Sequence, residues 1–280
     1  MSTPPRLTDR TALTLHRARA RANIVRFLHD EALAQVQERL EEVNRPFTKP
    51  AIVTGNPEIW GNTLPNAIIV DDTETITLTP QSHDLVVHAM ALHWADDPVG
   101  QLVQARRALR PDGLFLAVFP GGQTLHELRA ALAQAETSLR GGLSPRVAPM
   151  GEIRDLGGIL QRAGFAMPVA DSTPLSVTYD SAFHLMHDLR AMGETNALAA
   201  RERRFAPRAL FSQAAAVYAQ HFCHGTDRVR ATFDLVFLTG WAPDDSQPKP
   251  LRPGSAKARL ADALGVPELA AKDPVKPGCD

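Results

Sequence analysis

The segment from residue 83 to residue 122 has the clearest pattern of apolar and polar positions in the chain. It begins with a short apolar run, 84–87, of the kind that forms a buried parallel strand. Residues 98–109 carry apolar side chains at helical spacing, after an Asp-Asp-Pro sequence that suits a helix N-terminus. An Arg-Pro-Asp-Gly turn then leads into a second apolar run, 114–119. The pattern predicts a strand, a helix and a second strand of one parallel sheet.

The rest of the chain shows weaker patterns that predict further elements of an α/β fold. An amphipathic stripe predicts a helix over 24–43, and an apolar run predicts a first strand at 51–55. Further helices are expected over 124–138, 150–163, 181–192 and 207–221, a strand within 168–179, and a closing antiparallel strand over 229–241. Repeated prolines after Asp244 predict a disordered tail.

The 83–122 unit resembles the region from the fourth to the fifth strand of class I S-adenosylmethionine-dependent methyltransferases. The motifs that carry this resemblance are Leu92-His-Trp94 and Leu109-Arg-Pro-Asp-Gly113. Downstream stretches resemble the mitochondrial complex I assembly factor 5 family and its bacterial relatives, namely 121–129, Ala135-Glu136, 141–145, Asp155-Leu-Gly157, 162–165, 188–196 and 215–218. The resemblance runs from about residue 7 to residue 256, and is specific after His83 and poor over 46–78.

This resemblance implies a Rossmann-like methyltransferase fold with S-adenosylmethionine as cofactor. It also implies a protein partner, a subunit of the respiratory NADH dehydrogenase, because the family is associated with arginine hydroxylation on such a subunit. The chain departs from the pattern in its first half. Only the 28 residues 56–83 separate Gly55 from Asp84, whereas each crossover between parallel strands needs about a dozen residues or more. One strand candidate, 67–70, is visible there, so we expect a truncated N-terminal half of the sheet.

The loop after the first strand is where a class I methyltransferase holds its cofactor, and here it has lost most of its glycines. Gly55 remains, which lets backbone N–H groups approach a ligand. Pro57 offers no N–H, Glu58 adds a negative charge, and Trp60 is bulky. The loop therefore predicts weakened or lost S-adenosylmethionine binding.

Two carboxylates, Asp71 and Asp72, have two possible registers. If 67–70 is the second strand, Asp71 stands where the ribose-binding acid belongs; if it is the third strand, Asp72 lies on the adenine side. Counting back from Asp84 favours the third strand, which leaves the ribose acid missing. A third interpretation, two turn carboxylates, stays open.

Residues after the predicted 84–87 strand supply the other candidates. His93 and Trp94 follow that strand at the end where open α/β sheets bind ligands, and the helices over 181–221 are expected to form a cap above them. His93 is the catalytic candidate, although a hydrogen-bonded loop histidine is the commoner case. Trp94 could cover the cofactor or pack under the loop. The cofactor-binding candidates are Gly55, Asp71, Asp72, His88 and Trp94.

Histidine and cysteine pairs do not predict a metal site. His184/His187 and His221/Cys223/His224 have suitable spacing but lack a carboxylate or second thiol at ligand distance. No iron triad is apparent either.

Composition narrows the class of protein only slightly. With 30 basic and 31 acidic residues, the chain has no overall charge that would favour nucleic acid. Two cysteines indicate a reducing compartment, and neither a spanning run of apolar residues nor a secretory signal is visible. Residues 1–29 carry six arginines against one acid, which indicates either a solvated helix face or a docking surface for an acidic partner or a membrane-bound complex.

These observations predict three regions: a basic helical segment over 1–45, a methyltransferase-like domain over 46–243, and a Pro-rich tail over 244–280. Three functions remain open. The chain could be a methyltransferase-like binding or assembly protein with weakened S-adenosylmethionine binding, an active methyltransferase, or a protein-arginine hydroxylase. The expected location is the cytoplasm, with peripheral contact at the inner face of the membrane as an option.

Overall fold

The computed structural model describes residues 6–225, 227–248 and 265. By its internal contacts the chain divides into two compact units, Met1–Asp244 and Asp245–Asp280. The predicted Pro-rich tail lies for the most part outside the described residues, and the three predicted regions stay predictions.

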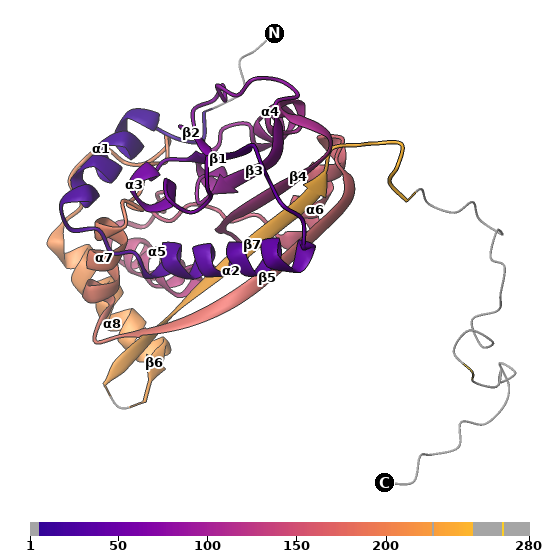
Figure 1. Ribbon diagram of the computed structural model, residues 1–280. Coiled ribbons are helices and arrows are strands. Elements are labelled where there is room, and N and C mark those ends of the chain that lie inside the picture. The colour runs from indigo at the N-terminus through magenta and orange to yellow at the C-terminus, as the bar shows by residue number, and fades with distance from the viewer. Residues whose placement is uncertain (1–5, 226, 249–264, 266–280) are drawn as a thin grey trace, which may run out of the picture. The chain divides into compact units, whose positions relative to one another are not determined.

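Seven strands within the described residues form one sheet in the order β2-β1-β3-β4-β7-β5, with β6 paired to β7 (Figure 1). Their bounds are β1 Pro50–Thr54, β2 Ile68–Val70, β3 His83–Ala89, β4 Leu109–Pro120, β5 Ala166–Tyr179, β6 Cys223–His224 and β7 Arg228–Trp241. The pairs among β2, β1, β3 and β4 are parallel, and β7 is antiparallel to both β4 and β5. This is the predicted mixed sheet with an antiparallel end, and β5 and β2 form its two edges.

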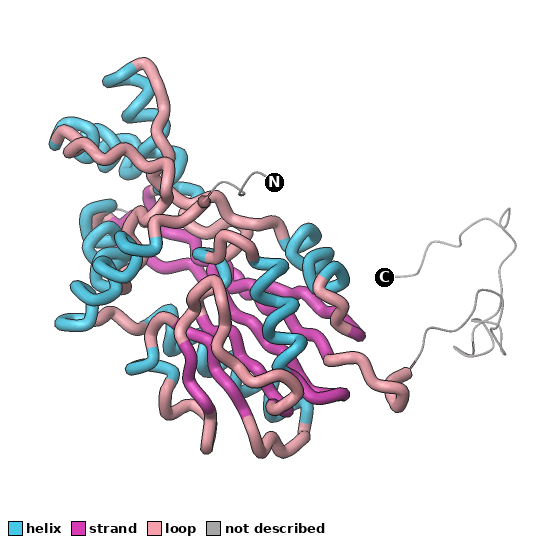
Figure 2. Tube along the Cα trace, turned by 90° about the horizontal axis from the view of Figure 1, so that it is seen from above, coloured by secondary structure: helices cyan, strands magenta, loops and turns pink. Residues whose placement is uncertain are grey.

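Helices lie on both sides of the strands, as the view from above shows (Figure 2). They are α1 Arg10–Ala20, α2 Phe27–Val43, α3 Pro57–Trp60, α4 Pro98–Ala108, α5 His126–Arg140, α6 Ile153–Arg162, α7 Ala182–Ala191 and α8 Arg208–His221, with short 3-10 turns at Arg21–Asn23 and Leu92–Trp94. Successive strand residues point to opposite faces. Leu85 and Val87 therefore join the core under α2, α5, α7 and α8, while Val86 joins the core under α4 and α6.

The shortened first half is confirmed. Between β2 and β3, residues 71–82 form neither helix nor strand, and the only helix between β1 and β2 is the four-residue α3. The missing unit is replaced by a loop that returns across the sheet. Ile76 of this loop is buried in the core beside α4, and its N–H donates to Gln104 Oε1 at 2.8 Å.

The favoured register of residues 67–70 is wrong. β2 pairs in parallel with β1, with Ala51 opposite Ile68, so it occupies the position of the second strand. Counting back from Asp84 failed because the return loop crosses from β2 to β3 without a helix, and thus needs fewer residues than a regular crossover. Asp71 and Asp72 therefore follow the strand beside β1, where a ribose-binding acid belongs in a dinucleotide fold.

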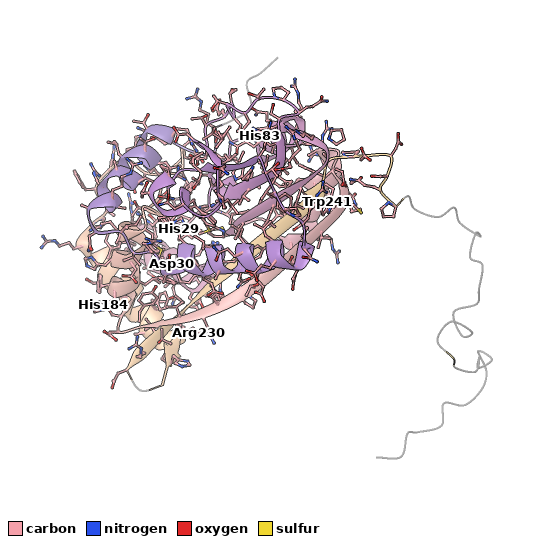
Figure 3. All side chains as sticks on the ribbon, viewed as in Figure 1. His29, Asp30, His83, His184, Arg230 and Trp241 are labelled. Carbon is pink, nitrogen blue, oxygen red and sulfur yellow. The ribbon has the colours of Figure 1, made fainter. Side chains whose placement is uncertain are left out.

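The downstream elements follow the predicted pattern. In α4 the Asp97 side chain accepts a hydrogen bond from Gly100 N at 2.8 Å, and Pro98 occupies the first turn. β5 and β7 pair from Ala166–Trp241 to Tyr179–Val229, so this antiparallel strand pair extends past the end of the β4–β7 pairing. Figure 3 labels Arg230 in this extension, His184 on α7, and Trp241 at the other end of β7.

Candidate functional site

Helix α1 crosses the ends of the strands where the ligand of an α/β sheet is expected. Its first turn is capped by Asp9, whose side chain accepts from Ala12 N at 3.1 Å. The N–H groups of Leu7 and Thr8 donate to Asp96 Oδ1, in the loop before α4, at 2.9 and 2.8 Å. Asp9 N also donates to Ala197 O at 2.7 Å. These contacts fix α1 between the loop after β3 and the segment after α7.

The side chain of Arg17, on α1, fills the space beside Gly55. A Cβ atom added to Gly55 would lie only 1.9 Å from Arg17 Nη1 and 2.2 Å from Arg17 Cζ. Arg17 Nη1 also donates to both carboxylate oxygens of Asp72, at 2.8 and 3.0 Å. The guanidinium thus lies between the end of β1 and the end of β2, where the sequence places a cofactor.

Asp72 is committed to an ion-pair cluster inside the protein. Its side chain is 4% exposed, and Arg10 adds a second pair at 3.0 Å to that made by Arg17. Burial opposes ionisation of this carboxyl, but the two guanidinium groups outweigh it and hold the pKa of Asp72 below its ordinary value. Asp71, the other candidate acid, is exposed.

The residues around Gly55 do not fit S-adenosylmethionine as they stand. The space beside Gly55 is filled by the Arg17 guanidinium. Of the two acids after β2, Asp72 is paired with two arginines, and Asp71, which stands in the ribose position, is exposed. Asn56 and Pro57 begin the short helix α3. Trp60 is a fully buried core residue whose Nε1 donates to His29 Nδ1, on α2, at 3.1 Å (His29 is labelled in Figure 3).

His88 is buried away from any opening. Its Nε2 lies 2.7 Å from Gln101 Oε1, and Gln101 Nε2 donates to Thr73 O at 3.1 Å. Burial lowers the pKa of His88, so the ring is neutral. These contacts hold the return loop against α4, which is a structural role.

A cavity of about 960 Å³ lies beside α1 and the predicted cap. It is lined by His93 and Trp94, by α1, α5, α7 and the loop before α6, and by residues 194–196. Residues 186–192 and Phe211, from the predicted cap, line this cavity together with His93 and Trp94. Of the predicted site residues, these two line the cavity, whereas Gly55, Asp71, Asp72 and His88 do not.

Glu194 organises the inner wall of this cavity. One of its oxygens, Oε2, lies 3.0 Å from His93 Nε2 and accepts from Trp94 Nε1 at 2.8 Å. Burial would raise the pKa of Glu194, but His93, Arg17 and Trp94 together lower it, so the group is a carboxylate. Within the described part of the chain, its Oε1 and the Nδ1 atom of His93 have no hydrogen-bond partner.

A carboxylate that orients a histidine in a lined cavity can support proton transfer to or from a bound group. Sequence reasoning did not single out Glu194, although it lies in the 188–196 stretch that carries the family resemblance. The only available signal was that stretch itself, because Glu194 and His93 are 101 residues apart. No group of three or more His, Cys, Asp or Glu among the described residues could hold a metal ion.

Comparison with known proteins agrees with the fold. Residues 28–117 match the family model described as a methyltransferase domain. The chain is 35% identical to the arginine-hydroxylase NDUFAF5, mitochondrial, of Danio rerio over 206 residues, which cover 74% of this chain and 64% of the relative. It is 37% identical to the Homo sapiens protein of the same name over 199 residues, 71% of this chain and 57% of the relative. Over residues 28–117 the chain is therefore similar to methyltransferase domains, and over most of its length it is similar to NDUFAF5.

This methyltransferase-fold protein resembles NDUFAF5 and also malonyl-[acyl-carrier protein] O-methyltransferases. It is 33% identical to that of Xylella fastidiosa (strain M23) over 184 residues, 66% of this chain and 59% of the relative. The chain spans less than two thirds of the length of each of these relatives.

Two solved structures are also similar to this chain. The YcgJ protein of Bacillus subtilis is 12% identical with a TM-score of 0.49, covering 77% of this chain and 100% of that one. Phosphoethanolamine N-methyltransferase 2 of Haemonchus contortus, in complex with S-adenosyl-L-methionine, is 12% identical with a TM-score of 0.41, covering 75% and 53%.

Proposed function

We propose that this protein is a relative of respiratory complex I assembly factors that has weakened or lost S-adenosylmethionine binding and acts by binding a protein partner. The observation that carries the proposal is the Arg17 guanidinium beside Gly55, paired with Asp72. It fills the space beside Gly55 that a cofactor needs and occupies Asp72, the buried acid after β2. The partner we propose is a subunit of NADH dehydrogenase, by analogy with the relatives.

Calorimetry on the purified chain tests the first half of the proposal. Loss of two or three hydrogen bonds to a charged ligand, at about 1.5–3 kcal/mol each, weakens binding by about 10²-fold or more. We expect S-adenosylmethionine and S-adenosylhomocysteine to bind with dissociation constants no tighter than roughly millimolar. Low micromolar constants for the unmodified protein would overturn this half and restore the cofactor-dependent enzyme.

The surface around the cavity is where we place the partner. Arg190, on α7, is exposed and lines the opening, and Asn196 Nδ2 donates to Pro145 O at 2.8 Å, which ties the cap to the loop after α5. Binding of purified NADH dehydrogenase subunits to the immobilised protein should weaken in Arg190→Ala. It should be unchanged in Arg154→Ala, a matched exposed arginine on α6. If no subunit binds, the proposed partner is wrong. If both variants bind like the wild type, the partner surface lies elsewhere.

An active methyltransferase is the second candidate. The cavity with the Glu194–His93 pair favours it, as does the resemblance to malonyl-[acyl-carrier protein] O-methyltransferases. This reading requires α1 to move, because Arg17 occupies the cofactor space. Transfer of labelled methyl groups from S-adenosylmethionine to cell-extract proteins or carrier-bound acids, lost in His93→Asn, would support it.

A protein-arginine hydroxylase is the third candidate, and it is favoured only by the activity for which the relatives are named. Mass spectrometry of NADH dehydrogenase subunits from cells with and without the gene would test it, as a gain of one oxygen on an arginine. For location we propose the cytoplasm, in contact with the inner face of the membrane, to be tested by cell fractionation. None of the helices in the described part of the chain is long and apolar enough to cross a membrane.

A further inference from the structure

We propose that α1 is an autoinhibitory strap, and that the Arg17 side chain, more than the degenerate loop, keeps S-adenosylmethionine from binding. Release of Arg17 from Asp72 would then open a site for an adenosine-type ligand at the ends of β1 and β2. The proposal rests on the proposed function, because it explains why binding of S-adenosylmethionine is weak. It goes further in making that weakness conditional on the position of one helix.

The first argument is that Arg17 competes for the same groups that a ligand would use. Its Nη1 donates hydrogen bonds to both carboxylate oxygens of Asp72, and its guanidinium covers the open side of Gly55. Asp72 is the buried carboxylate after β2, at the ends of the strands where an α/β sheet binds its ligand, and backbone N–H groups can approach a ligand only on the open side of a glycine. Arg17 and such a ligand cannot occupy the site together.

The second argument is that the guanidinium is incompletely satisfied where it lies. Its side chain is 7% exposed. In the part of the chain that the structure describes, its Nε and Nη2 atoms have no hydrogen-bond partner, and neither does the nearby Asn56 Nδ2. Buried donors without acceptors are costly, so this arrangement is less stable than a fully paired arginine would be. The unpaired donors therefore favour the interpretation that the Arg17 side chain can be displaced from this position.

The third argument concerns how α1 is attached. Its buried Ala12 and Leu13 form a small cluster with Trp94 and Ala197, separate from the two main cores. Its other anchors are polar: the contacts of its N-terminal segment with Asp96, and the pairs of Asp9 with Arg201 and Arg203 at 2.9 and 3.2 Å. Detaching α1 would therefore leave the sheet and its two main cores intact.

Apparent affinity is the intrinsic affinity multiplied by the fraction of molecules that can bind. A strap closed in most molecules thus lowers affinity in proportion to the open fraction. Removing the guanidinium should raise S-adenosylmethionine affinity by at least about 10-fold. Loosening the strap elsewhere should give a smaller gain, because Arg17 would still compete.

The test is calorimetry with S-adenosylhomocysteine on the full chain and three variants, each checked for folding by circular dichroism. Arg17→Ala empties the site. Asp9→Ala removes the cap and two ion pairs of α1 but leaves Arg17 and Asp72 in place, so it remains informative if Arg17→Ala does not fold. Arg10→Ala removes the other arginine from Asp72 while Arg17 still covers Gly55.

We expect tighter binding by Arg17→Ala, a smaller gain by Asp9→Ala, and none by Arg10→Ala. If neither Arg17→Ala nor Asp9→Ala binds better than the wild type, the strap is overturned and the loop itself explains the weak binding, so the proposed function stands. An equal gain of affinity in Arg10→Ala would also overturn the strap proposal, because binding would then depend on the charge around Asp72 and not on the space beside Gly55. Tight binding by the wild type would instead refute the proposed function, and the wild-type measurement alone shows this.

Discussion

Replacing Gly55 with alanine should destabilise the protein only while Arg17 is present. The new methyl carbon would lie 1.9 Å from Arg17 Nη1 and 2.8 Å from Nη2, far inside any real contact. The guanidinium must therefore leave, and its buried pair with Asp72 breaks. Breaking such a pair costs about 3–5 kcal/mol, so we expect Gly55→Ala to lower the free energy of unfolding by about 3 kcal/mol.

In the Arg17→Ala background the same substitution meets no guanidinium. The backbone at Gly55 is outside the left-handed region, so alanine is not strained there. There Gly55→Ala should leave the free energy of unfolding unchanged or raise it by about 0.4–1 kcal/mol, because alanine reduces the conformational entropy of the unfolded chain. The two substitutions should thus be coupled by about 3 kcal/mol, whereas independent ones add to within about 0.5 kcal/mol.

Urea unfolding of the wild type, both single variants and the double variant measures this coupling, with circular dichroism and tryptophan fluorescence as probes. Gly158→Ala in α6 is the control, since a Cβ added there meets nothing within 4 Å. It should stabilise the helix by about 0.5–1 kcal/mol in either background. Additive effects of Gly55→Ala and Arg17→Ala would show that the guanidinium does not lie beside Gly55.

Three further predictions concern titration and the cavity wall. Glu194→Gln should destabilise the fold by about 1–3 kcal/mol through weaker pairing with His93 and Trp94, and equal urea midpoints for variant and wild type would contradict it. Burial lowers the pKa of His29 from 6.5 to about 4. Between these pH values the unfolded chain binds a proton at His29 and the folded chain does not, so the free energy of unfolding should fall as pH drops from 6.5 to 4. The fall should be smaller in His29→Gln. Burial would raise the pKa of Glu136, but hydrogen bonds from an arginine and a serine lower it from 4.5 to about 2. The contribution of Glu136 to folding stability should therefore be complete above pH 4.5 and lost as pH falls to 2. Glu136→Gln should remove this part of the acid unfolding curve.

Local patterns predicted most of the fold. Helix α4 was predicted from its apolar spacing and its capping Asp97, and both signals lie within a few residues of each other. The strand pairing of β2 was not predictable in the same way, because pairing depends on how the return loop 71–82 packs. A residue count cannot distinguish a loop from a shortened crossover.

The candidate site was predicted only in part, for a similar reason. His93 and Trp94 follow a strand end, which the sequence reveals. Their partner Glu194 comes from a segment after α7, and Arg17 reaches Asp72 across 55 residues. The six arginines near the N-terminus suggested a solvated face or a docking surface. For Arg17 neither describes the outcome, since its side chain is buried.

The long edge strand β5 bears on how the protein behaves at high concentration. Fourteen residues of unpaired edge would ordinarily invite a strand from a second molecule. β5 contains Pro168 and Pro174, which have no N–H to offer, and a break in register between Ala166 and Val169 bends its start. This edge is therefore a poor template for intermolecular β-pairing. The protein can keep the long β5–β7 strand pair at the edge of its sheet with a lower risk of aggregation.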